Sequence, residues 1–182
     1  MGKPIARAVA GDATSHGPPL APGPGSLNVL AGNMPVWRAL PTGAGAALQA
    51  AQQAADVAVK AAETATKAAM GTPGAPAALA AETAAKTAAT AAMTSAMSAA
   101  ASASTGVAAA MGSKPGMSDT HLCTVPLVAP VPAPHGPGMV IDGSTTVMCN
   151  GLPVSRQGDT LIEALGGPDK IAMALTTVLV GG

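Results

Sequence analysis

The residues best suited to chemistry are three histidines and one cysteine. The 182-residue sequence contains three His and two Cys. Three imidazole nitrogens and one thiolate sulfur suit tetrahedral Zn²⁺, and a shell filled by four protein ligands leaves no position for a reactive water. We therefore predict a structural rather than a catalytic metal site. Its candidate ligands are His16, His121, Cys123 and His135.

The spacing of these residues favours their convergence. His121 lies two residues before Cys123, so on a strand both side chains would point to one side. His135 follows the Pro-rich segment 126–134, which could fold it back to the same point. On spacing alone a competing interpretation stays open, in which the three histidines are ordinary surface residues.

A repeat supplies the elements that must position these residues. Segments 25–38 and 143–156 align without a gap, and each is typical of a strand, a tight turn and a second strand. Asn150-Gly151 is a strong hairpin signal because both turn residues need positive φ. A third copy is divided: segment 176–182 matches the first strand and turn, and segment 3–7 matches the second strand. We therefore predict three similar units around one axis, with the two ends of the chain side by side.

Each unit then reaches an aspartate, which we interpret as a turn-forming residue. The three are Asp12, Asp119 and Asp159. The fourth residue after each Asp is His16, Cys123 or Glu163, and pseudo-threefold symmetry would bring these positions to one end of the axis. For Glu163 two interpretations stay open: an acceptor for a ligand histidine or, as we favour, a solvated carboxylate.

The register also assigns the second cysteine. Cys149 aligns with Ala31 and Val180 inside the first strand of each unit. Because those partners are apolar, Cys149 is predicted to be a small core residue rather than a ligand. Trp37 is the one aromatic residue of the sequence and adjoins the Ala-rich middle of the chain, so we expect it to pack helices against the repeat body.

The middle of the chain, residues 40–113, favours helix. Segments 44–70 and 76–111 are predicted helices, with a break at 71–74 and stop signals at Gly112 and Pro115. Glu82 and Lys86 form an i,i+4 pair with the acid first, which supports the second helix. Two long helices joined by a short turn predict an antiparallel helical hairpin. Three methionines are expected to offer an adaptable surface on it: Met93, Met97 and Met111.

Composition excludes several classes of protein. Nine basic and nine acidic side chains give no net charge, and only 10% of residues are charged. A nucleic-acid binder would need a basic patch, so we expect no nucleic-acid partner. The N-terminal segment lacks an apolar run of signal-peptide length. The uncharged stretch 87–111 is poor in Leu and Ile, so we expect no stable transmembrane anchoring.

The outer segments resemble the PAAR-repeat family, which is named for Pro-Ala-Ala-Arg. The copies here keep the Pro and the Arg: Pro4-Ile5-Ala6-Arg7, Pro35-Val36-Trp37-Arg38 and Pro153-Val154-Ser155-Arg156. Segments 12–17, 119–123 and 134–136 also look like family segments. The resemblance covers residues 1–39 and 114–182 and leaves residues 40–113 as an insertion.

This resemblance implies a fold and a cofactor. The fold is a mainly β, small conical body of three pseudo-threefold β-hairpin repeats, here with an inserted α-helical hairpin. Family members cap the trimeric valine-glycine-repeat spike protein (VgrG) of the bacterial type VI secretion system and carry zinc near the point. Many also bear extensions that are toxins or that recruit toxins. The resemblance therefore favours Zn²⁺ at the four candidate ligands.

The function expected on this basis is non-enzymatic. The chain would sharpen the VgrG spike for membrane puncture and help to attach or deliver an effector, directly or through an adaptor or chaperone. It would reside in the bacterial cytoplasm before firing and be translocated afterwards. The alternative is a membrane-active effector whose helical hairpin inserts into the target bilayer. We expect removal of residues 44–111 to leave zinc binding intact and to weaken attachment of partner or cargo.

Overall fold

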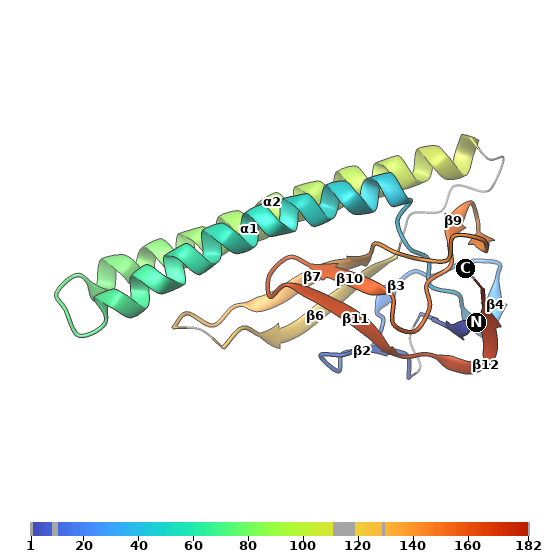
Figure 1. The fold of residues 1–182 in the computed structure, drawn as a ribbon, viewed down its shortest axis with the longest axis horizontal. Coiled ribbons are helices and arrows are strands. Elements are labelled where there is room, and N and C mark those ends of the chain that lie inside the picture. Colours follow the sequence, from blue (N-terminus) through green and yellow to red (C-terminus); the bar gives the residue numbers. More distant parts are fainter. Residues whose placement is uncertain (1, 9–10, 111–118, 129, 182) are drawn as a thin grey trace.

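The protein combines a helical hairpin with a β body (Figure 1). The structure is a computed structural model that describes residues 2–8, 11–110, 119–128 and 130–181. Within these residues the hairpin consists of α1 (Thr42–Ala69) and α2 (Ala75–Ala110). The β body is formed by the described residues before α1 and after α2. The fold is thus mixed: two helices of 28 and 36 residues join a body that is largely β, and the small conical form expected for this body stays a prediction.

The main sheet of the β body is antiparallel and curled. Its strand order is β2-β11-β10-β7-β6-β3. The strands are β2 (Ala13–Thr14), β3 (Pro22–Gly23), β6 (Thr120–Pro126), β7 (Pro134–Val140), β10 (Thr160–Glu163) and β11 (Pro168–Met173). Thr14 and Leu20 donate backbone hydrogen bonds to Pro18 and Asp12 at 3.1 and 2.9 Å. These bonds hold β2 against the segment that leads into β3. The two edge strands of the sheet, β2 and β3, are therefore connected by this short segment.

Three smaller hairpins repeat one register. They are β4 (Leu30–Ala31) with β5 (Met34–Pro35), β8 (Met148–Cys149) with β9 (Leu152–Pro153), and β12 (Leu175–Val180) with β1 (Lys3–Ile5). The motif prolines lie opposite equivalent residues: Leu30 faces Pro35, Met148 faces Pro153, and Leu179 faces Pro4. The divided third copy is therefore confirmed, and β4, β9 and β12 lie at the end of the molecule that holds both termini (Figure 1).

The turn chemistry is also as predicted. Asn150 and Gly151 have φ of 53° and 77°, and Gly32 and Asn33 have φ of 55° and 63°. This left-handed backbone matches the two-residue turns that suit the twist of a hairpin.

Backbone hydrogen bonds close the three units into a ring. The third residue of each Pro-x-x-Arg motif donates to the third residue of the next: Trp37 to Ala6 at 2.9 Å, Ala6 to Ser155 at 2.9 Å, and Ser155 to Trp37 at 3.0 Å. A closed cycle of three equivalent bonds requires three equivalent segments around one axis. The predicted arrangement of three similar units is therefore present in the backbone.

The helical hairpin begins and ends close to the predicted bounds. α1 runs over Thr42–Ala69 against the predicted 44–70, and α2 begins at Ala75 against 76. The predicted end at Met111 and the stop signals Gly112 and Pro115 lie outside the described residues. In the described part of the chain, neither helix combines the length and the apolar character that crossing a membrane requires.

The helical hairpin packs directly on the main sheet. Leu48 of α1 and Met93 and Met97 of α2 share one buried cluster with Met139 of β7 and Ile162 of β10. The expectation that Met93 and Met97 form an adaptable surface is wrong, because both are buried in this cluster; Met111 lies outside the described residues.

Trp37 has a different place from the expected one. It is fully buried and packs with Leu20, Leu161 and Ile171, all from the β body. The prediction that it joins the helices to the body is wrong, because the residues of its buried cluster all belong to the β body. Met93 and Met97 make the contact with the sheet instead.

One buried polar network links the two helices to the β6–β7 loop. Lys86 Nζ lies 2.7 Å from Glu82 Oε1 on the same helix and 3.2 Å from Glu63 Oε1 on α1. It also donates to the carbonyl oxygen of Val131 at 2.5 Å, and the Val131 N–H donates to Glu82 Oε1 at 3.1 Å. The i,i+4 pair predicted from sequence thus joins three segments.

Candidate metal centre

The aspartate of each unit binds the arginine of the same unit. In each pair the Arg backbone N–H and Nε donate to one carboxylate oxygen, and Nη2 donates to the other. The pairs are Arg7–Asp12, Arg38–Asp119 and Arg156–Asp159. The backbone N–H to oxygen distances are 2.7, 2.7 and 2.8 Å. The interpretation of these aspartates as turn-forming residues is therefore replaced by a role as partners of the arginine guanidinium groups.

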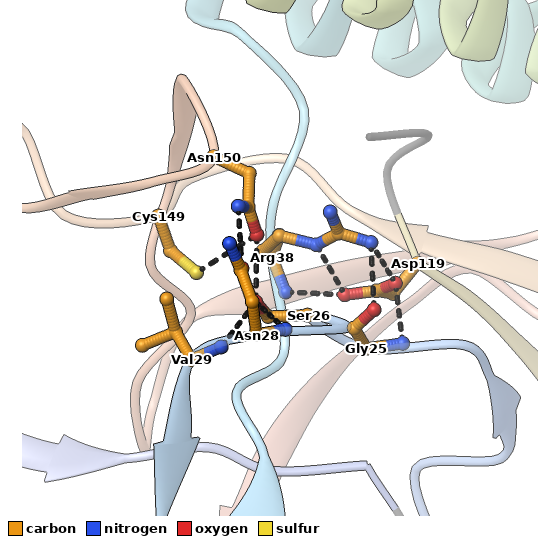
Figure 2. Close-up of polar contacts among 8 residues, drawn as sticks. All are labelled: Gly25, Ser26, Asn28, Val29, Arg38, Asp119, Cys149 and Asn150. Carbon is orange, nitrogen blue, oxygen red and sulfur yellow. Dashed lines mark hydrogen bonds and ion pairs between the residues drawn. The ribbon is translucent and has the colours of Figure 1, made fainter. Parts of the chain in front are cut away.

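Figure 2 shows the second of these pairs. Asp119 also accepts a hydrogen bond from the Gly25 N–H at 2.7 Å, and Arg38 Nη2 donates to the Gly25 carbonyl at 2.9 Å. Both members of the pair are almost completely buried. Because Asp119 follows α2 and Arg38 precedes α1, this pair joins the two points at which the helical hairpin leaves and rejoins the β body.

Four residues beyond each aspartate, the three chain segments meet. His16, Cys123 and Glu163 gather with His135, and one ligand atom from each of the four lies within 4.8 Å of the others. The predicted convergence of the three equivalent positions is present, and the Pro-rich loop does return His135 to the same point. The group could hold a metal ion.

The main sheet positions these side chains. Cys123 on β6 lies opposite Gly136 on β7, and Glu163 on β10 lies opposite Gly138. A Cβ atom at Gly138 would come within 2.9 Å of the Ile162 carbonyl oxygen, so only glycine lets β10 approach β7 this closely. His121 and Cys123 are buried while Leu122 is exposed, which confirms that the two alternate residues share one side of β6.

A second glycine, Gly166, allows the β10–β11 turn to lie close to His135. Gly166 has φ of 94°, and a Cβ atom there would lie 2.8 Å from the ring of His135. The β10–β11 turn therefore packs its backbone directly on that imidazole. This close approach restricts the position of the His135 ring.

The distances among the ligand atoms suit a small cation. His135 Nδ1 lies 2.7 Å from Glu163 Oε2, His16 Nδ1 lies 3.2 Å from the same oxygen, and the two nitrogens are 3.2 Å apart. A tetrahedral site with bonds of about 2.0 Å has edges of about 3.3 Å. The three atoms thus form one face of a polyhedron of nearly the right size.

The burial of these side chains also supports a bound metal ion. Glu163, Cys123 and His121 are fully buried, His135 is nearly so, and only His16 is partly exposed. Among the described side chains, Glu163 Oε1 and both ring nitrogens of His121 are buried without a hydrogen-bond partner. Leaving buried polar atoms unsatisfied is costly, so the donor set fits a bound metal ion.

The protonation of the group depends on its burial. Burial raises the pKa of the Cys123 thiol to about 11, and the Glu163 carboxylate adds to this effect. A bound cation is therefore what would favour the thiolate. Burial alone would raise the pKa of Glu163, but the neighbouring His121, His135 and Cys123 side chains outweigh it and leave that pKa below its ordinary value.

Two residues differ from the sequence expectations. Glu163 is not a solvated carboxylate: three histidines and a cysteine surround it at the end of β10. His121 is buried beside the group but lies outside the four residues whose ligand atoms come together, and its Nε2 is 3.6 Å from Glu163 Oε1. Cys149 is a core residue as predicted, and it shares a buried cluster with Ala31 and Val180.

Sequence reasoning missed one further carboxylate. Asp169 of β11 is buried, and its Oδ2 lies 3.2 Å from His16 Nδ1. Its Oδ1 accepts hydrogen bonds from the Ser15 hydroxyl and from the Lys170 N–H. Asp169 lies outside the aligned repeat segments, so no repeat position pointed to it.

Comparison with models of protein families, with curated proteins and with solved structures gives no match to this chain.

Proposed function

We propose that this chain is a non-enzymatic, zinc-stabilised tip that caps the trimeric VgrG spike of a type VI secretion system. In this proposal the tip sharpens the spike for membrane puncture and helps to attach or deliver an effector. Zinc is the metal we propose, because it favours a mixed set of imidazole, thiolate and carboxylate donors in tetrahedral geometry. When bound, it would cross-link the ends of three separate strand segments.

The observation that carries the proposal is a set of exposed apolar side chains repeated three times. Val29, Val147 and Val178 occupy equivalent positions and are 40, 39 and 38% exposed. The next residue along the chain in each unit, Leu30, Met148 or Leu179, is 60, 49 or 62% exposed. We call these six side chains the apolar triad face.

The apolar triad face belongs to the three small hairpins, at the end that holds both termini (Figure 1). Large apolar side chains gathered at one end of a protein are typical of a binding surface. A partner with threefold symmetry could contact all three hairpins in the same way, whereas a partner without it would match only one. This equivalence favours a trimer as the partner.

The other features agree with a mechanical role. The cluster at His16, Cys123, His135 and Glu163 supplies four ligands, which suits a structural ion better than a catalytic one. The chain would be made in the bacterial cytoplasm and translocated when the apparatus fires. The helical hairpin would offer its outer surface to an effector, an adaptor or a chaperone.

The alternative of a membrane-active effector has less support. The apolar side of the helical hairpin, at Leu48, Met93 and Met97, is already packed on the main sheet. Insertion into a bilayer would require this shared core to open.

The proposal is tested by placing charges on the apolar triad face. The triple variant Leu30→Asp, Met148→Asp, Leu179→Asp should lose at least tenfold in affinity for an immobilised cognate VgrG trimer, because three carboxylates would have to be desolvated at the interface. Val57→Asp on α1 is the matched control, since Val57 is 70% exposed and lies outside that face. Unchanged affinity of the triple variant, with its metal content preserved, would contradict the proposal.

A further inference from the structure

We propose that Glu163 is the fourth metal ligand and that His121, although predicted as a ligand, instead positions Glu163 from outside the shell. This inference rests on the zinc centre proposed above and names its donors. It differs from the sequence expectation in exchanging one imidazole for a carboxylate. The proposed shell is His16, Cys123, His135 and Glu163.

The position of Glu163 in the repeat supports this assignment. His16, Cys123 and Glu163 each follow the aspartate of their unit by four residues, and each aspartate is held by the same three hydrogen bonds to its arginine. The three segments therefore present these side chains from equivalent places. His121 lies only two residues after Asp119, and so it occupies a different level along the axis.

The two oxygens of Glu163 have different surroundings. Oε2 lies 3.2 Å from His16 Nδ1 and 2.7 Å from His135 Nδ1, which places it among the ligand atoms. Oε1 lies 3.6 Å from His121 Nε2 and has no hydrogen-bond partner. With Oε2 bound to the metal, Oε1 is left to accept a hydrogen bond from the His121 Nε2–H.

Such a histidine outside the shell is a familiar way to fix a ligating carboxylate. Outer partners of this kind orient the ligand, and their loss usually weakens metal binding by about 10–100-fold without removing a ligand. His121 is fully buried and lies opposite Gly138 on β7, so its ring is held at this place by the sheet. Asp169 also brings a buried Oδ2 without a hydrogen-bond partner to 3.2 Å from His16 Nδ1, but it lies outside the four residues whose ligand atoms are within 4.8 Å of one another, so it is the weaker candidate.

Charge balance is consistent with this shell. A thiolate from Cys123 and a carboxylate from Glu163 would neutralise Zn²⁺ within the shell itself. Glu163 is fully buried, and a buried carboxylate without a bound cation is costly. Direct ligation would place the cation in contact with the Glu163 carboxylate and so offset the cost of burying its charge.

The test uses X-ray absorption of the full-length, zinc-loaded chain, because imidazole rings give outer-shell scattering that carboxylates lack. The assignment predicts one sulfur, two imidazoles and one further oxygen ligand. Three imidazoles would overturn the assignment and leave the zinc centre itself in place. A wild-type chain that binds no zinc would overturn both.

Cobalt(II) substitution provides a second measurement on variants. Glu163→Gln should shift the cobalt d–d absorption bands and weaken metal affinity by at least about 100-fold. His121→Gln keeps an N–H donor for Oε1, so it should preserve the bands and lose at most about tenfold in affinity. Cys149→Ala is the control and should keep the sulfur-to-cobalt charge-transfer band, since Cys149 lies in the core. Wild-type bands in Glu163→Gln together with shifted bands in His121→Gln would contradict the proposal.

Discussion

The β body and the helical hairpin are stabilised in opposite ways. The β body has short strands, and specific polar contacts hold it at repeated points: three Arg–Asp pairs, a ring of backbone hydrogen bonds and a cluster of candidate metal ligands. The helical hairpin has long helices of small residues, and it rests mainly on apolar contact along its length. Each strategy suits its element, because short strands bury little apolar surface while long helices can bury an extended strip.

The two regions nevertheless share one core. Ile162 and Ala164 of the β body pack against Leu48 and Met97 of the helical hairpin. Glu163, which lies between Ile162 and Ala164 in the sequence, turns to the opposite side and joins the candidate metal centre. The strand that carries one proposed ligand is therefore held in place by the insertion. This finding changes the expectation that the insertion can be removed without effect on metal binding.

The largest effect is expected from removing the helical hairpin. Replacing residues 42–110 by a short Gly-Ser linker would expose Met139 and Ile162, and each large side chain returned to water costs about 1.5–3 kcal/mol. We expect metal affinity to fall at least tenfold and the melting temperature to fall with it, as measured by chelator competition and circular dichroism. Val57→Asp, an exposed change on α1, should alter neither. Wild-type metal affinity in the deleted form would show that the two regions are independent.

A smaller effect is expected from breaking one Arg–Asp pair. Arg38→Met leaves the buried carboxylate of Asp119 without its cation, which should cost about 3–5 kcal/mol in the free energy of unfolding. Arg7→Met should cost less, because the Arg7 side chain is 13% exposed against 3% for Arg38. Urea unfolding measures both. The double variant Arg38→Met, Asp119→Leu should recover much of the loss, and a double variant no more stable than Arg38→Met would contradict this role for the pair.

Much of the fold could be predicted because its signals are local. The gapless repeat fixed the register of the three small hairpins, and Asn150-Gly151 marked a turn with positive φ. The break at residues 71–74 placed the helix bounds to within two residues at the ends that the structure describes. The divided third copy followed from the same pattern, since Pro4 pairs with Leu179 as Pro35 pairs with Leu30.

The features that the sequence did not predict depend on contacts between segments that are distant along the chain. Both members of each Arg–Asp pair are present in every unit. The pairing was not predicted, because the sequence separations of the partners are unequal, at 5, 81 and 3 residues. The burial of Glu163 depends on the packing of His121 and His135 around it, which no spacing reveals. The positions of Trp37 and Met93 also depend on long-range packing. Met93 lies in the core shared by the helices and the sheet, and Trp37 lies in the core of the β body.

The most direct test of the central claim, a threefold body that caps a trimeric spike, is the mass of the complex with its cognate VgrG trimer under native conditions. The account predicts one copy of this 17.2-kDa chain on each trimer, because the chain itself supplies all three equivalent hairpins. Three copies on each trimer, or no complex at micromolar concentrations of both proteins, would contradict it.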